Sequence, residues 1–427
     1  MKGLFWFRHD LRIADNPALV ALSRRCNKAL MVYVIDPDWF RPTNHHSKHL
    51  GRFREEFLYQ SLRALERELK KRKQRLVVKV GNPLVVIPEL CKKHQIDLVS
   101  VTDHPGVYER QQVAYLMRTL PCEVSVSESF TLYLQSQLNF DRTTLPPTFS
   151  QFRKHIERKN ILPCIPISAP DSLPAFIDER RDLWGGQEFV YDLSPYHGGE
   201  DAGSVQLNQF FWKTYGLKNY KQTRNGFDGW QFSSRLSAWL ANGSLSPRIV
   251  AAELDNVEYR HGRSESTEAM FAELLWREYF QWMMHCHGAK MFAFSGIKDK
   301  RPLTTYYSEH YKAWEQGTTE FPIVNACMRQ LNQTGYMSNR GRQIVASCLV
   351  NELGVDWRFG AAYFEQQLID FDVAANYGNW QYLAGVGVDP RGQRHFNLEK
   401  QAKEYDPDGT FVERWANASA SESLLRY

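Results

Sequence analysis

Apolar and polar positions follow two rhythms along the first part of the chain. Five short runs rich in β-branched and aromatic residues have the length of strands, and amphipathic segments with helical apolar spacing separate them. This βαβ rhythm predicts an α/β domain built on a doubly wound parallel sheet. The expected strands are 3–7, 29–35, 76–80, 98–102 and 123–126, and the expected helices are 17–25, 47–73, 84–94 and 107–120.

Two helix starts and one missing motif refine this picture. Asn16-Pro17 and Asn82-Pro83 each place an N-capping side chain before a proline in the first turn. No G-x-G-x-x-G follows the first strand, where residues 5–10 read FWFRHD. A standard dinucleotide-binding domain is therefore excluded.

The pattern changes after the first domain, which we place at 1–130. Residues 131–203 carry repeated prolines and the Gly198-Gly199 pair, which predict an irregular linker between domains. From residue 204 strand patterns disappear, so we expect an all-α domain over 204–427, with a short Ser-rich stretch at 418–423. The expected helices are 204–213, 233–241, 247–256, 267–287, 322–334, 338–350 and 357–368.

Composition narrows the class of protein. At 427 residues and 43% hydrophobic content, the chain can bury a large core in two domains. No apolar run approaches the ~20 residues that span a bilayer, and the charged N-terminus lacks a signal-peptide core, so we expect a cytoplasmic protein without a membrane partner. The net charge of +5 permits a polyanionic partner, and 12 Trp and 20 Tyr suit base stacking or electron hopping as well as packing.

The cysteines and histidines predict neither disulfides nor a metal site. The seven cysteines are far apart and form no CxxC pair, so we expect them to be reduced. Residues 285–287 read His-Cys-His, but neighbouring residues on a helix face different directions, which disfavours shared metal ligation. Shared metal ligation is disfavoured in the same way for His45, His46 and His49.

A serine-rich segment could bind a phosphate group. Residues 233–237 read SSRLS and open a predicted helix directly after the turn-forming segment 224–229. Hydroxyls and free backbone N–H groups at a helix N-terminus suit a pyrophosphate, and they equally suit an ordinary helix cap.

Charged residues gather on the apolar helices that follow. Glu273, Trp276 and Arg277 share one helix face, as in a binding site or in a salt bridge beside a core indole. Further on, polar residues again recur at helical spacing, and two carboxylates sit among apolar neighbours and would need partners if buried. Arg342 is the expected partner of Asp370; the other residues concerned are Asn339, Gln343 and Asp372.

Four segments, in this order along the chain, resemble the FAD and substrate motifs of the photolyase and cryptochrome superfamily: 233–237, 273–278, 335–343 and 370–382. Thr223 to Gly226 (TRNG), Ser338 to Gln343 (SNRGRQ) and the stretch 377–387 (YGNWQYLAGVG) resemble the DASH cryptochrome branch. The N-terminal segment WFRHDLR at 6–12 agrees as well, and the resemblance covers essentially the whole chain.

The resemblance implies an FAD site in the helical domain. The pyrophosphate would lie on the serine segment, a phosphate oxygen near Tyr220, and the flavin N5 near Asn376, whose neutral amide does not oppose a negative charge. Arg342 would pair with Asp370, and Asp372 would accept hydrogen bonds from the cofactor. The other implied cofactor contacts are Ser233, Ser234, Leu236 through its backbone, Ser237, Arg277 and Asn339.

The resemblance also implies a substrate face. Trp276 would stack on a flipped pyrimidine pair while Glu273 hydrogen-bonds its polar edge. Tyr382 and Gln343 stand where strong duplex-repairing relatives have Trp and Met. We therefore expect a preference for single-stranded or looped DNA, because extracting a lesion from a duplex costs a few kcal/mol.

Electron supply would run through Trp380 and Trp357, which match the inner and middle members of the family's tryptophan chain. Counting back from Trp314 by the family spacing lands on Thr304, so the outer member is missing. Tyr306, Tyr307 or another aromatic residue would have to substitute, or photoreduction would be slow.

Taken together, the resemblance predicts an enzyme that splits cyclobutane pyrimidine dimers with light, and a monomer. Glu109 resembles the carboxylate that contacts an antenna, 5,10-methenyltetrahydrofolate in most DASH members. The competing hypothesis is a blue-light photoreceptor or DNA-binding regulator without repair turnover, which would use the same FAD site. The resemblance leaves the choice between DNA and RNA open.

Overall fold

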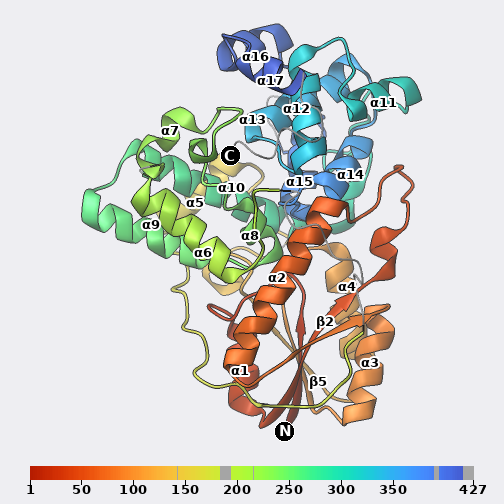
Figure 1. Ribbon diagram of the computed structural model, residues 1–427, viewed down its shortest axis with the longest axis vertical. Coiled ribbons are helices and arrows are strands. Elements are labelled where there is room, and N and C mark those ends of the chain that lie inside the picture. Colours follow the sequence, from red (N-terminus) through yellow and green to blue (C-terminus); the bar gives the residue numbers. More distant parts are fainter. Residues whose placement is uncertain (142, 183–193, 215, 389–393, 417–427) are drawn as a thin grey trace.

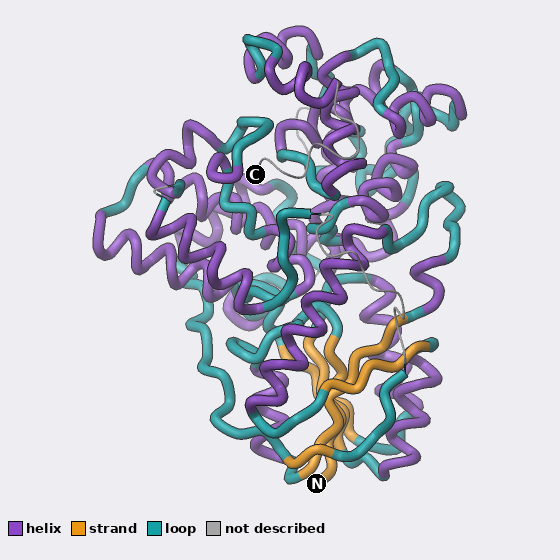
Figure 2. Tube along the Cα trace, viewed as in Figure 1, coloured by secondary structure: helices purple, strands orange, loops and turns teal. Residues whose placement is uncertain are grey.

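The computed structural model describes residues 1–141, 143–182, 194–214, 216–388 and 394–416, so the Ser-rich stretch at 418–423 lies outside the described residues. A sheet flanked by helices forms one part of the molecule, and a larger helical part is stacked on it along the long axis (Figures 1 and 2). This arrangement confirms the fold class expected from the sequence.

The sheet is parallel, with strand order β3-β2-β1-β4-β5, and its five main strands agree with the predicted ones. Leu4 on the first strand pairs with Leu30 on one side and Val99 on the other, and apolar residues continue along both faces. Burial on both faces explains why these strands read as unbroken apolar runs. The strands are β1 (Lys2–Phe7), β2 (Lys28–Ile35), β3 (Leu76–Val80), β4 (Leu98–Thr102) and β5 (Glu123–Ser127).

Four helices cover the two faces of the sheet. The side chains of Phe5 and Phe7 pack with α1 (Pro17–Arg25) and α2 (Arg52–Lys71), whereas Leu4 and Trp6 pack with α3 (Pro83–His94) and α4 (Val107–Thr119). Both predicted caps form as expected. Asn16 accepts a hydrogen bond from the backbone N–H of Leu19 at 3.1 Å, and Asn82 accepts one from Leu84 at 2.8 Å.

The segment 131–203 is more ordered than its prolines suggested, which corrects the expectation of an irregular linker. It contains α5 (Phe149–Arg158), whose Phe152 and Ile156 are buried in the core of the helical part. The Pro146-Pro147 pair precedes this helix, and Thr148 caps it by accepting from the Gln151 N–H at 3.3 Å. A short strand, β6 (Ala175–Phe176), then pairs with β2.

Among the described residues after 203, the named elements are all helical, as expected for the second domain. Several predicted helices need correction. The one expected at 204–213 begins at Glu200 and is π-helical from Gln209, and the one expected at 247–256 continues to His261. The one expected at 233–241 begins only at Ser237, and the one expected at 338–350 ends in a π-helical turn, Cys348–Glu352. Among the described residues after 203, five α-helices were not predicted: those at 220–223, 308–316, 373–383, 398–405 and 410–416. The main helices are α6 (Glu200–Asn208), α7 (Tyr220–Thr223), α8 (Ser237–Asn242), α9 (Pro247–His261), α10 (Glu265–His287), α11 (Ser308–Gln316), α12 (Pro322–Thr334), α13 (Asn339–Ser347), α14 (Trp357–Gln367), α15 (Val373–Leu383), α16 (Leu398–Tyr405) and α17 (Thr410–Ala416).

A buried arginine ties the two parts of the chain together. The guanidinium of Arg12 donates to the carbonyl of Gly243 at 3.0 Å, to that of Ser129 at 3.0 Å and to that of Asp15 at 2.8 Å. Gly243 lies so close to the first domain that an added Cβ would be 2.0 Å from the His9 carbonyl oxygen. Only glycine fits there, since its φ of +71° also disfavours any side chain.

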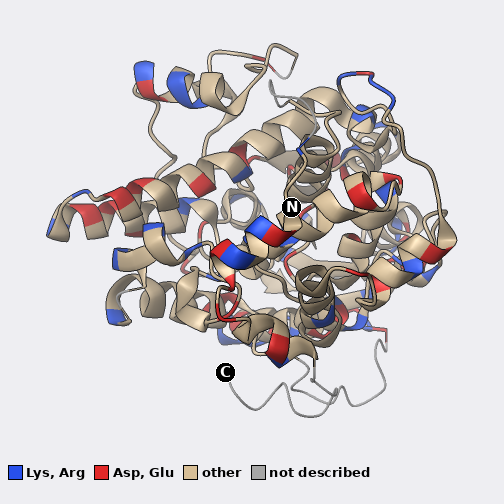
Figure 3. Cartoon of the chain, turned by 90° about the horizontal axis from the view of Figure 1, so that it is seen from above, with Lys and Arg blue, Asp and Glu red and all other residues tan. Residues whose placement is uncertain are grey.

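Two surface features bear on partners. Seen from above, Lys and Arg are interspersed with Asp and Glu on the helices (Figure 3). No helix in the described part of the chain is long and apolar enough to cross a membrane.

All seven cysteines are free, as expected.

Candidate functional site

The expected ion pair forms at the centre of the helical part. The Arg342 guanidinium donates to both carboxylate oxygens of Asp370, at 3.0 and 2.8 Å, and its Nε donates to the carbonyl of Met337. Burial by itself lowers the pKa of Arg342, but the attraction of Asp370 outweighs burial and leaves that pKa raised. The ion pair fixes α13 against the loop that precedes α15.

Asp372 begins α15 and meets polar groups from α10. One of its carboxylate oxygens accepts from the Ala375 N–H at 2.9 Å, which caps the helix. The amide of Gln281 donates to both oxygens, at 3.1 and 2.9 Å, and the Arg277 guanidinium lies 3.8 Å away. Asn376 follows one turn later, where its amide nitrogen donates to the Ala361 carbonyl at 3.0 Å.

A cavity brings most of these residues together. Polar donors and acceptors line one part of it, and Phe364, Leu383 and the indole of Trp380 line another. A flavin needs both kinds of contact, because its ring is flat and apolar on its faces while its edge carries hydrogen-bonding atoms. The residues present therefore fit the cofactor. The polar lining consists of Asn339, Arg342, Gln343, Asp370, Asp372, Asn376 and Asn379.

The serine segment lies before α8 and not within it. Ser233 is extended, Ser234 is buried, and Ser237 is the exposed first residue of the helix. Leu236 stands at the N-cap position and offers no side-chain cap, so the first-turn N–H groups have no partner from it. This is the arrangement that an anion needs, although the helix begins later than expected. Tyr220 is buried at the start of α7.

Arg277 and Asn339 have different surroundings. The Arg277 guanidinium donates to the Phe130 carbonyl at 2.9 Å and lies over the Phe130 ring, 4.5 Å from its centroid. Burial lowers the pKa of Arg277, with Asp372 acting in the opposite direction. Asn339 is the exposed first residue of α13. Asn339 lines the cavity, whereas Arg277 is not part of the lining and already has partners within the protein.

Two of the four expected substrate residues, Trp276 and Tyr382, are in contact, whereas Gln343 lines the cavity described above. The ring of Trp276 lies edge-on to that of Tyr382, with centroids 6.2 Å apart. Phe149 from α5 stacks on Trp276 at 3.8 Å with an angle of 10° between the rings. Glu273 forms an ion pair with Arg224, and the Tyr382 hydroxyl contacts Arg394.

The two tryptophans expected to carry electrons lie on adjacent helices. Trp380 contacts Phe364 at 5.1 Å between ring centroids and Trp314 at 6.3 Å. A Cβ at Gly360 would be 2.2 Å from the Trp380 ring, so glycine is required where α14 approaches this indole. Trp357 lies one turn earlier on α14, fully buried, and its Nε1 donates to the Phe294 carbonyl at 3.1 Å.

A second, larger cavity of about 820 Å³ lies between the sheet and the helical part. Its volume is within the roughly 300–1,000 Å³ range of small-molecule sites. Glu109 lines it together with His9, whose Nε2 is 3.2 Å from the carboxylate, and His104, which stacks on His9 at 4.2 Å. Burial lowers the pKa of His104 well below its ordinary value, and Glu109 acts in the opposite direction. Phe371 and Asp372 line both cavities.

Sequence reasoning missed several residues of these sites. His9, Phe149, Arg224 and Gln281 contact predicted site residues across long sequence separations, and His104 lies five positions before Glu109. Arg224 and His9 each stood inside a quoted motif, at 223–226 and 6–12, and Arg224 was an available basic partner for Glu273. The remaining contacts depend on the tertiary fold and left no periodic or motif signal.

Comparisons with known proteins show the family to which the chain belongs. Residues 3–171 match the family model described as DNA photolyase, and residues 270–422 match the FAD binding domain of DNA photolyase. The chain is 45% identical to a cryptochrome DASH of Idiomarina loihiensis over 99% of this chain and 94% of that relative. It is also 45% identical to a cryptochrome DASH of Vibrio parahaemolyticus over 97% of this chain and 93% of that relative.

Solved structures give the same result. The fold is similar to that of a Synechocystis cryptochrome, with a TM-score of 0.92 and 37% identity, covering 98% of this chain and 90% of that one. It is also similar to a bacterial class III photolyase from Agrobacterium tumefaciens, with a TM-score of 0.83 and 28% identity, covering 97% of this chain and 86% of that one.

Proposed function

Since the chain belongs to the DASH cryptochromes of the photolyase and cryptochrome superfamily, we propose that it repairs cyclobutane pyrimidine dimers in single-stranded or looped DNA under blue light. Its FAD-binding domain makes it a flavoprotein of a DNA-repair and light-sensing family. The observation that carries the proposal is the pair of rings of Trp276 and Tyr382, with Glu273 one turn before Trp276 on α10. Flat rings beside a carboxylate suit a base pulled out of its stack.

The residues that would hold FAD divide into three groups. Ser233, Ser234, the backbone of Leu236, Ser237 and Tyr220 would bind the phosphates; Arg277, Asn339 and Asp372 would contact the rest of the cofactor; Asn376 would lie near the flavin N5. When bound and reduced, FAD supplies the chemistry by giving an electron to the dimer after absorbing light and taking it back once the dimer bonds break.

The chain's own residues orient and screen this site. The Arg342–Asp370 ion pair holds two walls of the cavity in place and neutralises its own charge. Asp372 is a hydrogen-bond acceptor already fixed by Gln281 and by the start of α15. Asn376 is anchored through its amide nitrogen, so a neutral side chain is presented with a defined orientation.

The preference for open strands rests on Tyr382 and Gln343. A tyrosine ring has less stacking area than an indole, and its hydroxyl is already engaged by Arg394. Gln343 is polar where a thioether would pack against a base. Both features reduce the binding free energy that could offset the cost of unstacking a base pair in a duplex. A strand that is already open does not incur that cost.

Trp276 also accepts a flat ring against its face. Phe149 lies parallel to it at 3.8 Å, which is the contact geometry of a stacked base. A base bound in this position would have to replace the Phe149 ring. The N-terminal end of α5 would then move with substrate binding.

The cavity of about 820 Å³ suits an antenna of the methenyltetrahydrofolate class. Glu109 is ionised there, since its partners His104 and His9 lower its pKa against the opposing effect of burial. A carboxylate of this kind accepts the paired N–H donors on the edge of a pterin.

Illumination of the purified, reduced protein with dimer-containing oligonucleotides tests the function. Single-stranded and duplex DNA and a single-stranded RNA are compared in parallel. Repair of the single strand above the duplex supports the proposal, and equal repair of both contradicts the roles of Tyr382 and Gln343. Light-dependent reduction of the flavin without repair of any substrate would instead favour the photoreceptor.

A further inference from the structure

The aromatic residues around Trp380 form a path to the surface that does not use Trp357. Trp380 meets Trp314 on α11 edge-on, with centroids 6.3 Å apart. Trp314 is fully buried, and its indole N–H donates to the Val345 carbonyl at 2.8 Å. A backbone carbonyl is too weak a base to take the proton from an oxidised indole. An oxidised Trp314 therefore keeps its indole proton, and its positive charge can move to the next ring instead of remaining on Trp314.

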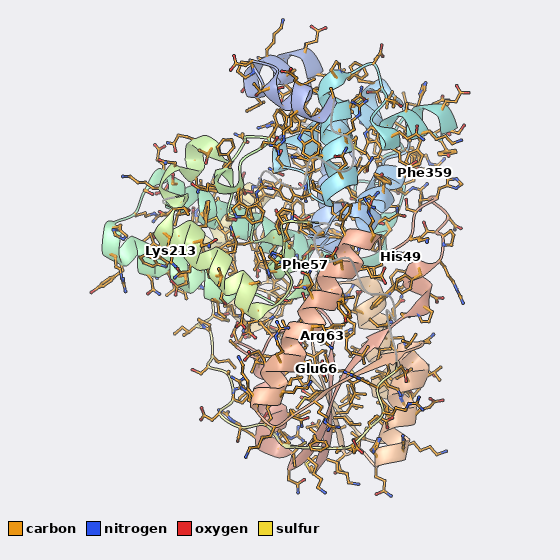
Figure 4. The ribbon with its side chains drawn as sticks, in the orientation of Figure 1. His49, Phe57, Arg63, Glu66, Lys213 and Phe359 are labelled. Atoms are coloured by element: carbon orange, nitrogen blue, oxygen red, sulfur yellow. The ribbon has the colours of Figure 1, made fainter. Side chains whose placement is uncertain are left out.

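The path continues through two tyrosines. Trp314 lies 6.3 Å from the ring of Tyr311, one turn earlier on α11, and Tyr311 lies 6.0 Å from Tyr306. Exposure rises only at the end, because Tyr311 is 2% exposed whereas Tyr306 is 36% exposed. Phe359, which is labelled in Figure 4, packs on both tyrosine rings, with centroid distances of 5.7 Å to Tyr311 and 4.4 Å to Tyr306.

The branch through Trp357 ends differently. The ring of Trp357 contacts Tyr377 at 6.2 Å, and the Tyr377 hydroxyl donates to Glu365 at 3.2 Å. Tyr377 is buried and lines the cavity between the two parts of the chain, so this branch leads toward the proposed antenna site. Of the aromatic groups described here, Tyr306 ends a continuous series of ring contacts at the solvent.

We propose that Tyr306 is the terminal electron donor of this protein, and that Trp314 and Tyr311 relay the electron to Trp380. The inference rests on the proposed function, because it concerns the reduction of the flavin that the site would bind. Once Trp380 has given one electron to the photoexcited oxidised flavin that the site would bind, each ring in turn gives one electron to the next: Trp314 to Trp380, Tyr311 to Trp314, and Tyr306 to Tyr311. Tyr306 then releases its phenolic proton to water and remains as a neutral radical.

A reductant in solution converts the radical at Tyr306 back to the phenol. A small thiol supplies one hydrogen atom, which restores the phenol, and two of the resulting thiyl radicals combine to a disulfide. Only an exposed end of the relay can meet such a reductant, and Tyr306 meets that requirement whereas Trp314 and Tyr311 do not. The missing outer tryptophan at Thr304 is thereby replaced by a tyrosine from the loop before α11.

Tyr306 and its neighbour Tyr307 provide a matched pair of variants. Tyr307 is 51% exposed, and the ring contact found for it among the described residues is with His310, outside the relay. The protein carrying oxidised FAD is illuminated with blue light, frozen within milliseconds and examined by electron paramagnetic resonance for a tyrosyl radical. Flavin reduction with a thiol present is followed by absorbance in the same samples.

We expect Tyr306→Phe to remove most of the tyrosyl radical and to slow flavin reduction several-fold, while Tyr307→Phe matches the unmodified protein. Trp314→Phe should also remove the radical, and Trp357→Phe should retain it. A full radical signal in Tyr306→Phe, or its loss in Tyr307→Phe, would overturn the proposal. Both tyrosines are at the surface, so their variants decide the question even if Trp314→Phe does not fold. Failure of the unmodified protein to hold FAD would refute the proposed function instead.

Discussion

Arg342 and Asp370 form an ion pair in which a single guanidinium nitrogen donates to both carboxylate oxygens. Asp370 is 7% exposed, so removing Arg342 leaves a buried charge without its counter-ion. We expect Arg342→Met to lower the free energy of unfolding by about 3 kcal/mol, in the range known for broken buried pairs. Urea denaturation of the protein without cofactor measures this. The double variant Arg342→Met/Asp370→Leu should recover part of the loss; an equal loss in both variants would contradict the pairing argument.

Trp276 is expected to bind substrate without holding the cofactor. Trp276→Ala should weaken binding of a dimer-containing single strand by about 1–3 kcal/mol, which is roughly five- to 150-fold, because a stacking surface is lost. Fluorescence anisotropy with a labelled oligonucleotide measures the affinity, and flavin absorbance checks that FAD content is unchanged. Trp212→Phe, at a partly buried tryptophan bonded to Glu253, serves as a control. Unchanged affinity in Trp276→Ala would exclude this residue from the substrate face.

Substitutions at two positions should shift the preference for single-stranded DNA toward duplex DNA. Tyr382→Trp combined with Gln343→Met is expected to raise repair of duplex DNA at least several-fold, since more stacking energy becomes available to offset unpairing. Repair of single strands should change little. The ratio of duplex to single-strand repair under saturating light is the readout. A ratio equal to that of the unmodified protein would show that strand preference arises elsewhere.

Glu109 should affect binding of the antenna and not binding of the flavin. Glu109→Gln keeps the size of the side chain but removes the charge that His9 and His104 stabilise, so retention of added methenyltetrahydrofolate is expected to fall at least ten-fold. The folate absorption band after gel filtration reports this, with the flavin band as internal control. Loss of both bands together would indicate a folding defect.

Glu179 should make the first domain sensitive to acid. Its carboxylate lies 2.7 Å from Lys93 and 2.6 Å from His94, and these bonds outweigh burial and lower its pKa to about 2. A carboxylate with a lowered pKa stabilises the fold fully above its unfolded pKa, near ~4.3, and this contribution is lost as the pH falls toward 2. Thermal unfolding midpoints should therefore drop less between pH 6 and pH 3 in Glu179→Gln than in the unmodified protein. Glu89→Gln, at an exposed position on α3, should behave like the unmodified protein.

Local signals predicted most of the fold. The five strands and the helix starts at Asn16 and Asn82 follow from apolar periodicity and capping chemistry, which act over a few residues. The helix α5 was missed because Pro146-Pro147 suggested disorder, although both prolines lie before its cap at Thr148. The helix α11 was missed because only Tyr311 and Trp314 are buried on it, too few for a clear apolar stripe.

The candidate site was predictable only in part. The Arg342–Asp370 pair followed from two charges among apolar residues, and the structure contains it. The stacking of Phe149 on Trp276 and the approach of Trp314 to Trp380 join residues 127 and 66 positions apart. Such contacts depend on how whole helices pack, so no local spacing in the sequence could indicate them.

The position of Arg12 affects how the molecule melts. Its one guanidinium satisfies carbonyls on both sides of the domain boundary, so separation of the two parts would leave those carbonyls and a buried charge unmatched at once. The two parts should therefore lose their structure in a single calorimetric transition. Each half expressed alone should have an aggregation-prone face where its other half is missing.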